Sequence, residues 1–96
     1  MKAQMYNYSS WIDETNPSIL YDYFMGKLNN AGFGVENVIE KHFKPQGYTS
    51  LFLLSESHFA VHTFPEESKS YIELSSCNYD FYEMFKLECG VFWHCW

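Results

Sequence analysis

The feature of this sequence that most constrains its fold is the segment LFLLSESHFAVHTFPE at residues 51–66. Its first four residues are all apolar, and the mostly polar residues SESH follow them. Residues 59–64 then alternate in the way expected of a strand with two different faces, and Pro65-Glu66 closes the segment. A short apolar run and an alternating run bounded by turn residues are typical of β-strands. The segment therefore predicts two strands joined by a tight connection.

The second of these strands carries two histidines on one face, because successive side chains of a strand point to opposite faces. One face is predicted to hold His58, Ala60, His62 and Phe64, and the other Ser57, Phe59, Val61 and Thr63. Two histidines beside a small and an aromatic residue are more typical of a functional site than of a core. The histidine face is therefore a candidate functional site.

Length and charge limit the classes of protein to which the chain can belong. Its 96 residues suffice for one hydrophobic core, so we expect a single domain over residues 1–96. So short a chain buries only about 60–65% of its unfolded surface, which favours dimerisation. Aromatic residues make up 21% of the chain, enough to fill a core or a subunit interface. The net charge of −6, with six lysines and no arginine, argues against a protein that binds a nucleic-acid backbone.

No part of the sequence has the features of a secretory signal or a membrane span. The first residues are mixed polar and aromatic rather than apolar, and no run approaches the roughly 18 apolar residues of a span. Cys77, Cys89 and Cys95 are odd in number and lack paired spacing, which is typical of reduced thiols. We therefore expect a cytoplasmic protein that contacts no membrane.

The rest of the chain predicts two helices and further strands. Asn16 and Pro17 form a typical helix start, apolar residues recur at helical spacing, and Gly32 suits the helix end, which predicts a helix over residues 17–30. Asn78 is a candidate cap for a second helix that ends at residue 86. Strands are predicted at residues 1–8, 35–44, 49–54, 59–64 and 71–75, and a loop that includes Trp11 at residues 9–16. These elements indicate an α+β two-layer sandwich, a mostly antiparallel sheet covered by two helices.

Three motifs in the chain resemble those of a known family. They are Glu56-Ser57-His58, then HTFPE at residues 62–66, and then Cys77, twenty residues after the serine. In this spacing the chain resembles the prokaryotic-type S-adenosylmethionine decarboxylases, whose proenzymes cut themselves. The segment HFKPQG at residues 42–47 is similar to the family's stretch entering the preceding strand, and the resemblance extends over residues 19–85.

The resemblance implies that the chain cuts itself between Glu56 and Ser57. Ser57 Oγ would attack the Glu56 carbonyl to give an ester, and β-elimination followed by hydrolysis would turn the serine into a pyruvoyl group. The products would be a β chain, residues 1–56, and an α chain, residues 57–96. The pyruvoyl ketone would form a Schiff base with the substrate's amino group and act as the electron sink for decarboxylation.

The resemblance also assigns roles to three other residues. His62 would be the base for the elimination, although an ideal strand places it on the face opposite Ser57, so that a bulge or a reorientation is required. Thr49 stands where the family has a processing hydroxyl, usually serine, and an ordinary strand residue is the alternative. Cys77 would donate a proton to the product carbanion, since a thiol with a pKa of about 8.5 is mostly protonated at neutral pH. Burial as a small apolar side chain is the alternative for Cys77.

Substrate contacts are implied for Phe43, Phe64 and Glu66. The two phenylalanines occupy aromatic positions near the substrate, and an aromatic face attracts a sulfonium by about 0.5–2 kcal/mol per contact. Glu66 matches a ribose-binding glutamate, whose carboxylate can accept hydrogen bonds from two hydroxyls. Phe64 replaces the family's usual tryptophan, a better cation–π surface, so a lower affinity or a different substrate is expected. Core packing is the alternative for both phenylalanines.

The C-terminal end departs from the family, whose members continue the second helix for several turns and add a strand. Residues 87–96 here include Gly90 and are crowded with Trp, Phe and Cys, which favours a truncated or frame-shifted terminus. Cys89, His94 and Cys95 are candidate zinc ligands, but they contain no C-x-x-C pair, so we expect no metal site.

The leading prediction is a pyruvoyl-dependent S-adenosylmethionine decarboxylase that supplies the aminopropyl donor for spermidine synthesis. The resemblance implies a homodimer of αβ units with sites close to the interface. Relatives with the same chemistry that decarboxylate arginine or ornithine are an alternative, which loss of the aromatic and acidic substrate residues would favour. The third interpretation is a non-maturing, truncated interaction module, which the C-terminal end favours and the intact motifs disfavour.

Overall fold

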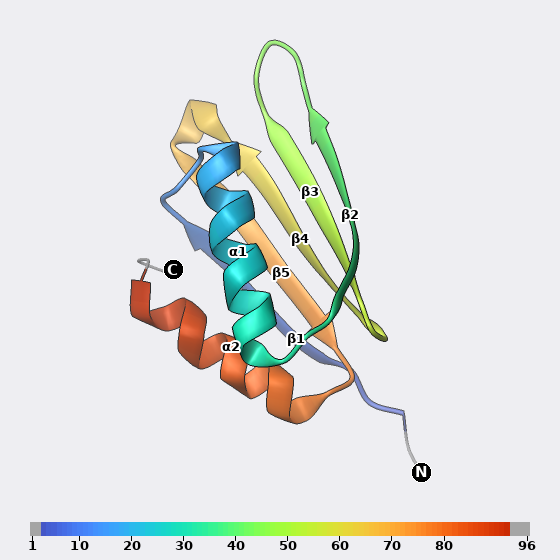
Figure 1. Cartoon of the computed structure of the whole chain (residues 1–96). Helices are drawn as coiled ribbons and strands as arrows, with labels where there is room; N and C mark the ends of the chain where they lie inside the picture. Colours follow the sequence, from blue (N-terminus) through green and yellow to red (C-terminus); the bar gives the residue numbers. More distant parts are fainter. Residues whose placement is uncertain (1–2, 93–96) are drawn as a thin grey trace.

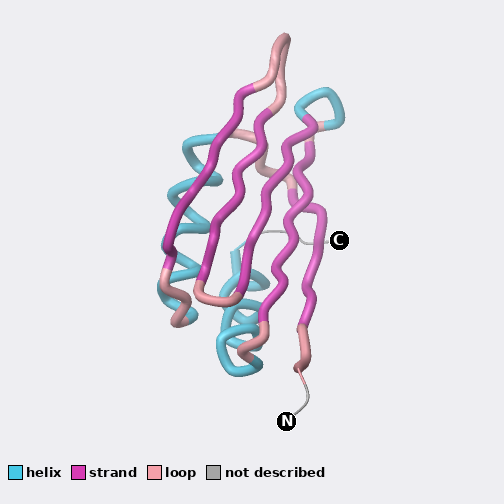
Figure 2. The backbone as a smooth tube through the Cα atoms, turned by 90° about the vertical axis from the view of Figure 1, so that its right-hand side faces the viewer, coloured by secondary structure: helices cyan, strands magenta, loops and turns pink. Residues whose placement is uncertain are grey.

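The computed structural model describes residues 3–92, which form one sheet covered on one face by two helices (Figure 1; Figure 2). The helices are α1 (Pro17–Ala31) and α2 (Tyr79–Phe92), and a short 3-10 helix, η1 (Pro65–Glu67), joins the fourth and fifth strands. The strands are β1 (Tyr6–Ile12), β2 (Val35–His42), β3 (Tyr48–Leu54), β4 (Ser57–Phe64) and β5 (Lys69–Ser76). Their order across the sheet is β1-β5-β4-β3-β2, and every neighbouring pair is antiparallel. The predicted α+β two-layer sandwich is confirmed.

The core lies between the sheet and the helices and is built around aromatic rings. Phe24 of α1, Phe59 of β4 and Phe85 of α2 are fully buried. The ring centres of Phe24 and Phe59 are 4.8 Å apart, and those of Phe59 and Phe85 are 5.3 Å apart. Burying one large apolar side chain contributes about 1.5–3 kcal/mol. Alternation along β4 therefore decides which of its faces meets the helices, with Phe59 and Val61 inside and His58 exposed.

Helix α1 agrees with its predicted limits to within one residue. At its start, Asn16 Oδ1 accepts hydrogen bonds from the N–H groups of Ser18 and Ile19, at 3.0 and 3.2 Å. At its end, Gly32 has a φ of 108°, a conformation that glycine adopts without strain. A Cβ at this position would lie 2.6 Å from the ring of Phe81. The helix therefore ends where only glycine fits.

The predicted first strand and the loop after it are wrong in their limits. β1 runs from Tyr6 to Ile12, so Trp11 belongs to a strand rather than to a loop. The polar pair Ser9 and Ser10 conceals this strand in the sequence, yet each residue of β1 has a partner in β5. Backbone pairing supplies the hydrogen bonds whatever the side chains are. Smaller differences occur in β2, which ends two residues before its predicted limit, and in β5, which begins two residues before it.

The predicted end of the second helix at residue 86 is also wrong. α2 continues to Phe92, through Gly90. Glycine costs a helix only about 1 kcal/mol relative to alanine, which the packing of neighbouring residues readily offsets. Cys89, one residue earlier, is fully buried in the core. Two of the candidate zinc ligands, His94 and Cys95, lie outside the described residues.

Candidate active site

The face of the sheet that no helix covers, which we call the outer face (Figure 2), carries three of the predicted site residues, Thr49, His62 and Phe64. On β3 and β4 the outer face consists of Thr49, Leu51, Leu53, His58, Ala60, His62 and Phe64. The prediction that both histidines share a face with Ala60 and Phe64 is therefore confirmed. Ser57 lies on the other, inner face, as predicted.

The Glu56–Ser57 peptide bond belongs to the tight turn between β3 and β4. Only Ser55 and Glu56 join the two strands, because Leu54 and Ser57 are already paired with each other. Glu56 has a φ of 55°, in the left-handed region that non-glycine residues rarely adopt. Such a conformation stores of order 1–3 kcal/mol of strain. The predicted scissile bond is therefore next to a strained residue.

Ser57 is the first residue of β4 and is only 6% exposed. Its hydroxyl donates a hydrogen bond to Ser76 Oγ at 3.1 Å. Ser76 lies directly opposite Ser57 on β5, and Cys77 follows it as an exposed residue outside any disulfide. The register of β4 with β5 thus brings the predicted scissile serine and the predicted proton donor to one end of the sheet. Sequence reasoning missed Ser76, because no motif indicates which residue of a neighbouring strand faces Ser57.

His62 lies on the outer face, towards the other end of β4. Its Nδ1 is 3.0 Å from Thr49 Oγ1, and the two residues are direct neighbours across β3 and β4. The imidazole also stacks on the ring of Tyr71, with ring centres 6.5 Å apart and an interplanar angle of 23°. The two residues that the resemblance assigns to processing are therefore in contact with each other.

Ser57 and His62 do not meet within one chain. Five residues of a strand span about 16 Å, and the two side chains point to opposite faces. β4 pairs regularly with both neighbours from Ser57 to His62, so this described stretch contains no bulge that would bring the two together. The site is therefore divided into two groups. We call Glu56, Ser57, Ser76 and Cys77 the cleavage group, and Thr49, His62 and Tyr71 the histidine group.

The three residues predicted to contact the substrate come from the loop between β2 and β3, the end of β4 and η1. These segments lie at one end of the sheet (Figure 1), the end nearer to the histidine group. Phe43 belongs to the loop between β2 and β3, Phe64 ends β4, and Glu66 belongs to η1; all three are exposed. The ring centre of Trp11 lies 5.6 Å from that of Phe64. Lys69 Nζ lies 4.6 Å from the centre of the Trp11 ring. Trp11 was missed from the sequence because its strand was assigned to a loop.

A third polar contact lies on the inner face near this end of the sheet. The hydroxyl of Tyr48 donates a hydrogen bond to the carboxylate of Glu40. Burial, together with this hydrogen bond, raises the pKa of Tyr48 to about 12. Tyr48 therefore stays protonated at neutral pH and acts as a hydrogen-bond donor rather than as a base.

Among the described residues, neither helix has the length and apolar character needed to cross a membrane. The same residues contain no group of three or more His, Cys, Asp or Glu side chains placed to hold a metal ion.

Comparisons with known proteins identify the family. Residues 9–90 match the family described as S-adenosylmethionine decarboxylase. S-adenosylmethionine decarboxylase proenzyme 2 of Bacillus cereus is 47% identical over 47 residues, which are 49% of this chain and 38% of that protein. The S-adenosylmethionine decarboxylase proenzyme of Prochlorococcus marinus is 36% identical over 72 residues, 60% of this chain and 58% of that protein. These two matches therefore span between 38% and 58% of the relatives' own length.

A solved structure has a similar fold. The crystal structure of the adenosylmethionine decarboxylase from Aquifex aeolicus superposes with a TM-score of 0.69, covering 94% of this chain and 83% of that one. Its sequence identity of 16% supports the fold alone. The family match, in contrast, takes in most of the chain, including Ser57, His62 and Cys77. The chain therefore belongs to the S-adenosylmethionine decarboxylase family.

Proposed function

We propose that this chain is a proenzyme that cuts itself between Glu56 and Ser57 and then decarboxylates S-adenosylmethionine. The observation that carries the proposal is the cleavage group, in which the hydroxyl of a buried serine follows a strained residue in a tight turn. The attacking oxygen and the carbonyl carbon belong to adjacent residues, so no further assembly is needed to bring them close. The two products, a β chain of residues 1–56 and an α chain of residues 57–96, would stay together because the cut leaves every strand pair of the sheet in place.

The surroundings of Ser57 fit the pyruvoyl group that such a cut would leave. The group would supply a ketone that binds the substrate's amino group and withdraws electrons as carbon dioxide is lost. Ser76 Oγ, 3.1 Å from Ser57 Oγ, places a polar side chain beside this position. Cys77, exposed at the end of β5, would protonate the product carbon. A free thiol in this role suits the cytoplasm, where cysteines stay reduced.

The substrate proposal depends on the aromatic side chains near Phe64. A sulfonium carries a fixed positive charge, which an aromatic face attracts. The ring of Trp11 already lies against a cation, the ammonium group of Lys69, which supports a cation-binding role for this surface. Phe64 stands where the family usually carries tryptophan, and Trp11 provides an indole ring beside it. The product would be the aminopropyl donor for spermidine synthesis, and Glu66 would accept hydrogen bonds from the ribose hydroxyls.

Release of labelled carbon dioxide tests the substrate. The self-cut protein is expected to act on carboxyl-labelled S-adenosylmethionine and to leave arginine and ornithine, which lack a sulfonium, essentially untouched. Phe64→Ala is expected to raise KM by about 3-fold to 30-fold, the loss of one cation–π contact. Tyr79→Ala, at another exposed aromatic residue, on α2, is the matched control and should leave KM unchanged. Faster release from arginine or ornithine would contradict the proposed substrate.

We also propose that two copies of the chain associate through their outer faces. Ile39, Leu51 and Leu53 are apolar side chains on the neighbouring strands β2 and β3, and they are 62%, 45% and 55% exposed. They border a hollow of about 300 Å³, to which His58 also contributes. A continuous exposed apolar patch of this kind is typical of a protein interface.

A second copy of the chain is the partner that the divided site favours. The cleavage group and the histidine group lie near opposite ends of β4. A twofold axis that lies in the interface, at right angles to the strands, would place the cleavage end of each chain beside the histidine end of its partner. Such a dimer would bring each histidine group to the end of the partner's sheet that carries the cleavage group, which neither chain achieves alone. Because the Ser57 side chain lies on the inner face, it would still have to turn outward to meet the partner's histidine group.

Substitution of one exposed leucine tests the dimer. Leu53→Lys is expected to weaken self-association by about a hundredfold or more, because an ammonium group would be buried in an apolar interface. Leu87→Lys is the matched control, since Leu87 lies on α2, away from the outer face, and is 68% exposed. Sedimentation measures both variants against the unaltered chain. A stable monomer with full activity would contradict the proposed dimer.

A further inference from the structure

Ser76 is placed to control the orientation of the Ser57 hydroxyl. It is fully buried on the inner face and lies directly opposite Ser57. The proton of Ser57 points to Ser76 Oγ, which accepts it at 3.1 Å. A hydroxyl has one proton and two lone pairs. With its proton directed to Ser76, Ser57 keeps both lone pairs free for attack on a carbonyl carbon.

Ser76 is itself held in one orientation by Asn78. The N–H of Asn78 donates to Ser76 Oγ at 3.0 Å, and the hydroxyl of Ser76 donates to the carbonyl oxygen of Asn78 at 3.3 Å. The single proton of Ser76 is thus committed to Asn78, and one of its lone pairs is committed as well. Its remaining lone pair accepts the proton of Ser57. Every hydrogen-bonding position of Ser76 is therefore used, and the hydroxyl has no alternative partner to turn to.

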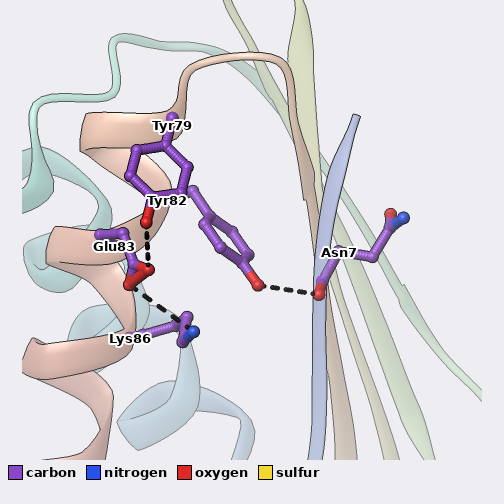
Figure 3. Close-up of polar contacts among 5 residues, drawn as sticks. All are labelled: Asn7, Tyr79, Tyr82, Glu83 and Lys86. Carbon is purple, nitrogen blue, oxygen red and sulfur yellow. Dashed lines mark hydrogen bonds and ion pairs between the residues drawn. The ribbon is translucent and has the colours of Figure 1, made fainter. Parts of the chain in front are cut away.

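Asn78 is in turn anchored at the start of α2. Its side chain accepts a hydrogen bond from the N–H of Phe81, and its carbonyl oxygen accepts one from the N–H of Tyr82, both at 3.0 Å. The hydroxyl of Tyr82 donates to the carbonyl oxygen of Asn7 at 3.2 Å, which ties the first turn of α2 to β1 (Figure 3). A continuous chain of contacts therefore runs from Ser57 to the rigid junction of helix and sheet.

We propose that Ser76 is a positioning residue for self-cleavage, which fixes Ser57 Oγ in the orientation that attacks the Glu56 carbonyl carbon. This inference rests on the proposed self-cleavage. In that step a bond forms between Ser57 Oγ and the Glu56 carbonyl carbon, and the bond from that carbon to the Ser57 nitrogen breaks. The proton of the hydroxyl ends on the freed amine, so the step is an isomerisation that needs no other reactant. Ser76 makes and breaks no bond in it.

The first-order rate of cutting, followed on labelled full-length chain after cell-free synthesis, tests the inference. Ser76→Ala is expected to slow cutting by about tenfold to a hundredfold, the usual cost of a misplaced reacting group. Ser70→Ala is the matched control. Ser70 is also fully buried on the inner face of β5, but its hydroxyl bonds to the carbonyl oxygen of Glu14, away from Ser57. Ser70→Ala is expected to cut within about twofold of the unaltered chain, even with a comparable loss of melting temperature.

A second pair of variants separates the hydroxyl from packing. Threonine and valine have nearly the same shape, and only threonine can accept the proton of Ser57. Ser76→Thr is therefore expected to cut at least about ten times faster than Ser76→Val. The added methyl group affects the packing of both variants alike, so it does not change this ratio. Equal rates in this pair, or equal slowing by Ser76→Ala and Ser70→Ala, would overturn the role of Ser76 while leaving self-cleavage intact. An unaltered chain that never cuts would overturn the proposed function, and this inference with it.

Discussion

Ser57→Ala is expected to leave the chain uncut, whereas the unaltered chain is expected to yield two fragments divided between Glu56 and Ser57. The hydroxyl of Ser57 is the only oxygen of this residue that can attack the carbonyl before it, and alanine removes it without disturbing the strand. Activity is expected to disappear with the cut, because the ketone that would replace the serine is the group proposed to bind substrate. Intact-mass measurement of freshly purified protein shows both results. The second fragment should lack an N-terminal amine.

The neighbouring serine is the control for this experiment. Ser55 lies in the same turn, and its hydroxyl bonds to the carboxylate of Glu36 at 3.1 Å, away from the scissile bond. Ser55→Ala is therefore expected to cut at the normal position. If Ser57→Ala were cut like the unaltered chain, the nucleophile would have to be another group. If the unaltered chain stayed whole on incubation, no pyruvoyl group would form, and the interaction module would become the better interpretation.

Local chemistry made much of the fold predictable from sequence. The two strands on either side of residues 55 and 56 follow from an apolar run and an alternating run, and the structure contains both. α1 follows from a capping asparagine, a proline and a terminal glycine, and its limits agree to within one residue. Features that depend on neighbours in the sequence were therefore accessible. The motif around Ser57 could also be found from the sequence, because its residues lie on one continuous stretch.

Features that depend on partners distant in sequence were not accessible. β1 contains two serines and was partly missed, since pairing with β5 holds it in place rather than any pattern of its own. The contact between Ser57 and Ser76 follows from the register of β4 with β5, which no motif encodes. Helix α2 extends beyond its predicted end at residue 86, because buried Cys89 continues the packing of the helix against the core beyond Phe85. In each of these cases a tertiary contact outweighed a local signal.

The position of His62 has the largest consequence for mechanism. The sequence already placed it on the face opposite Ser57, and the regular pairing of β4 leaves it there, at about 16 Å along the strand. His62→Ala is expected to slow conversion of the serine to the pyruvoyl group by about 10²-fold to 10⁴-fold, the usual contribution of a positioned base. His42→Ala is the control, an exposed histidine at the end of β2 whose ring packs on Tyr48. It is expected to mature at the normal rate.

Co-expression of two inactive chains then decides whether His62 acts within a chain or across a dimer. A chain with Ser57→Ala keeps its histidine but cannot be cut, and a chain with His62→Ala keeps its serine but lacks the base. In a mixed dimer, the end of the second chain that carries the intact serine would lie beside the intact histidine of the first. The His62→Ala chain is therefore expected to mature when the two chains, carrying different tags, are made together, and to stay immature when made alone.

Adding Leu53→Lys to both chains should abolish this rescue, because it removes the proposed interface. Rescue would mean that self-cleavage requires association, which gives so small a chain a reason to expose apolar side chains on its uncovered face. Failure to rescue, with dimers present, would place the base within the chain and require β4 to rearrange before the serine is converted.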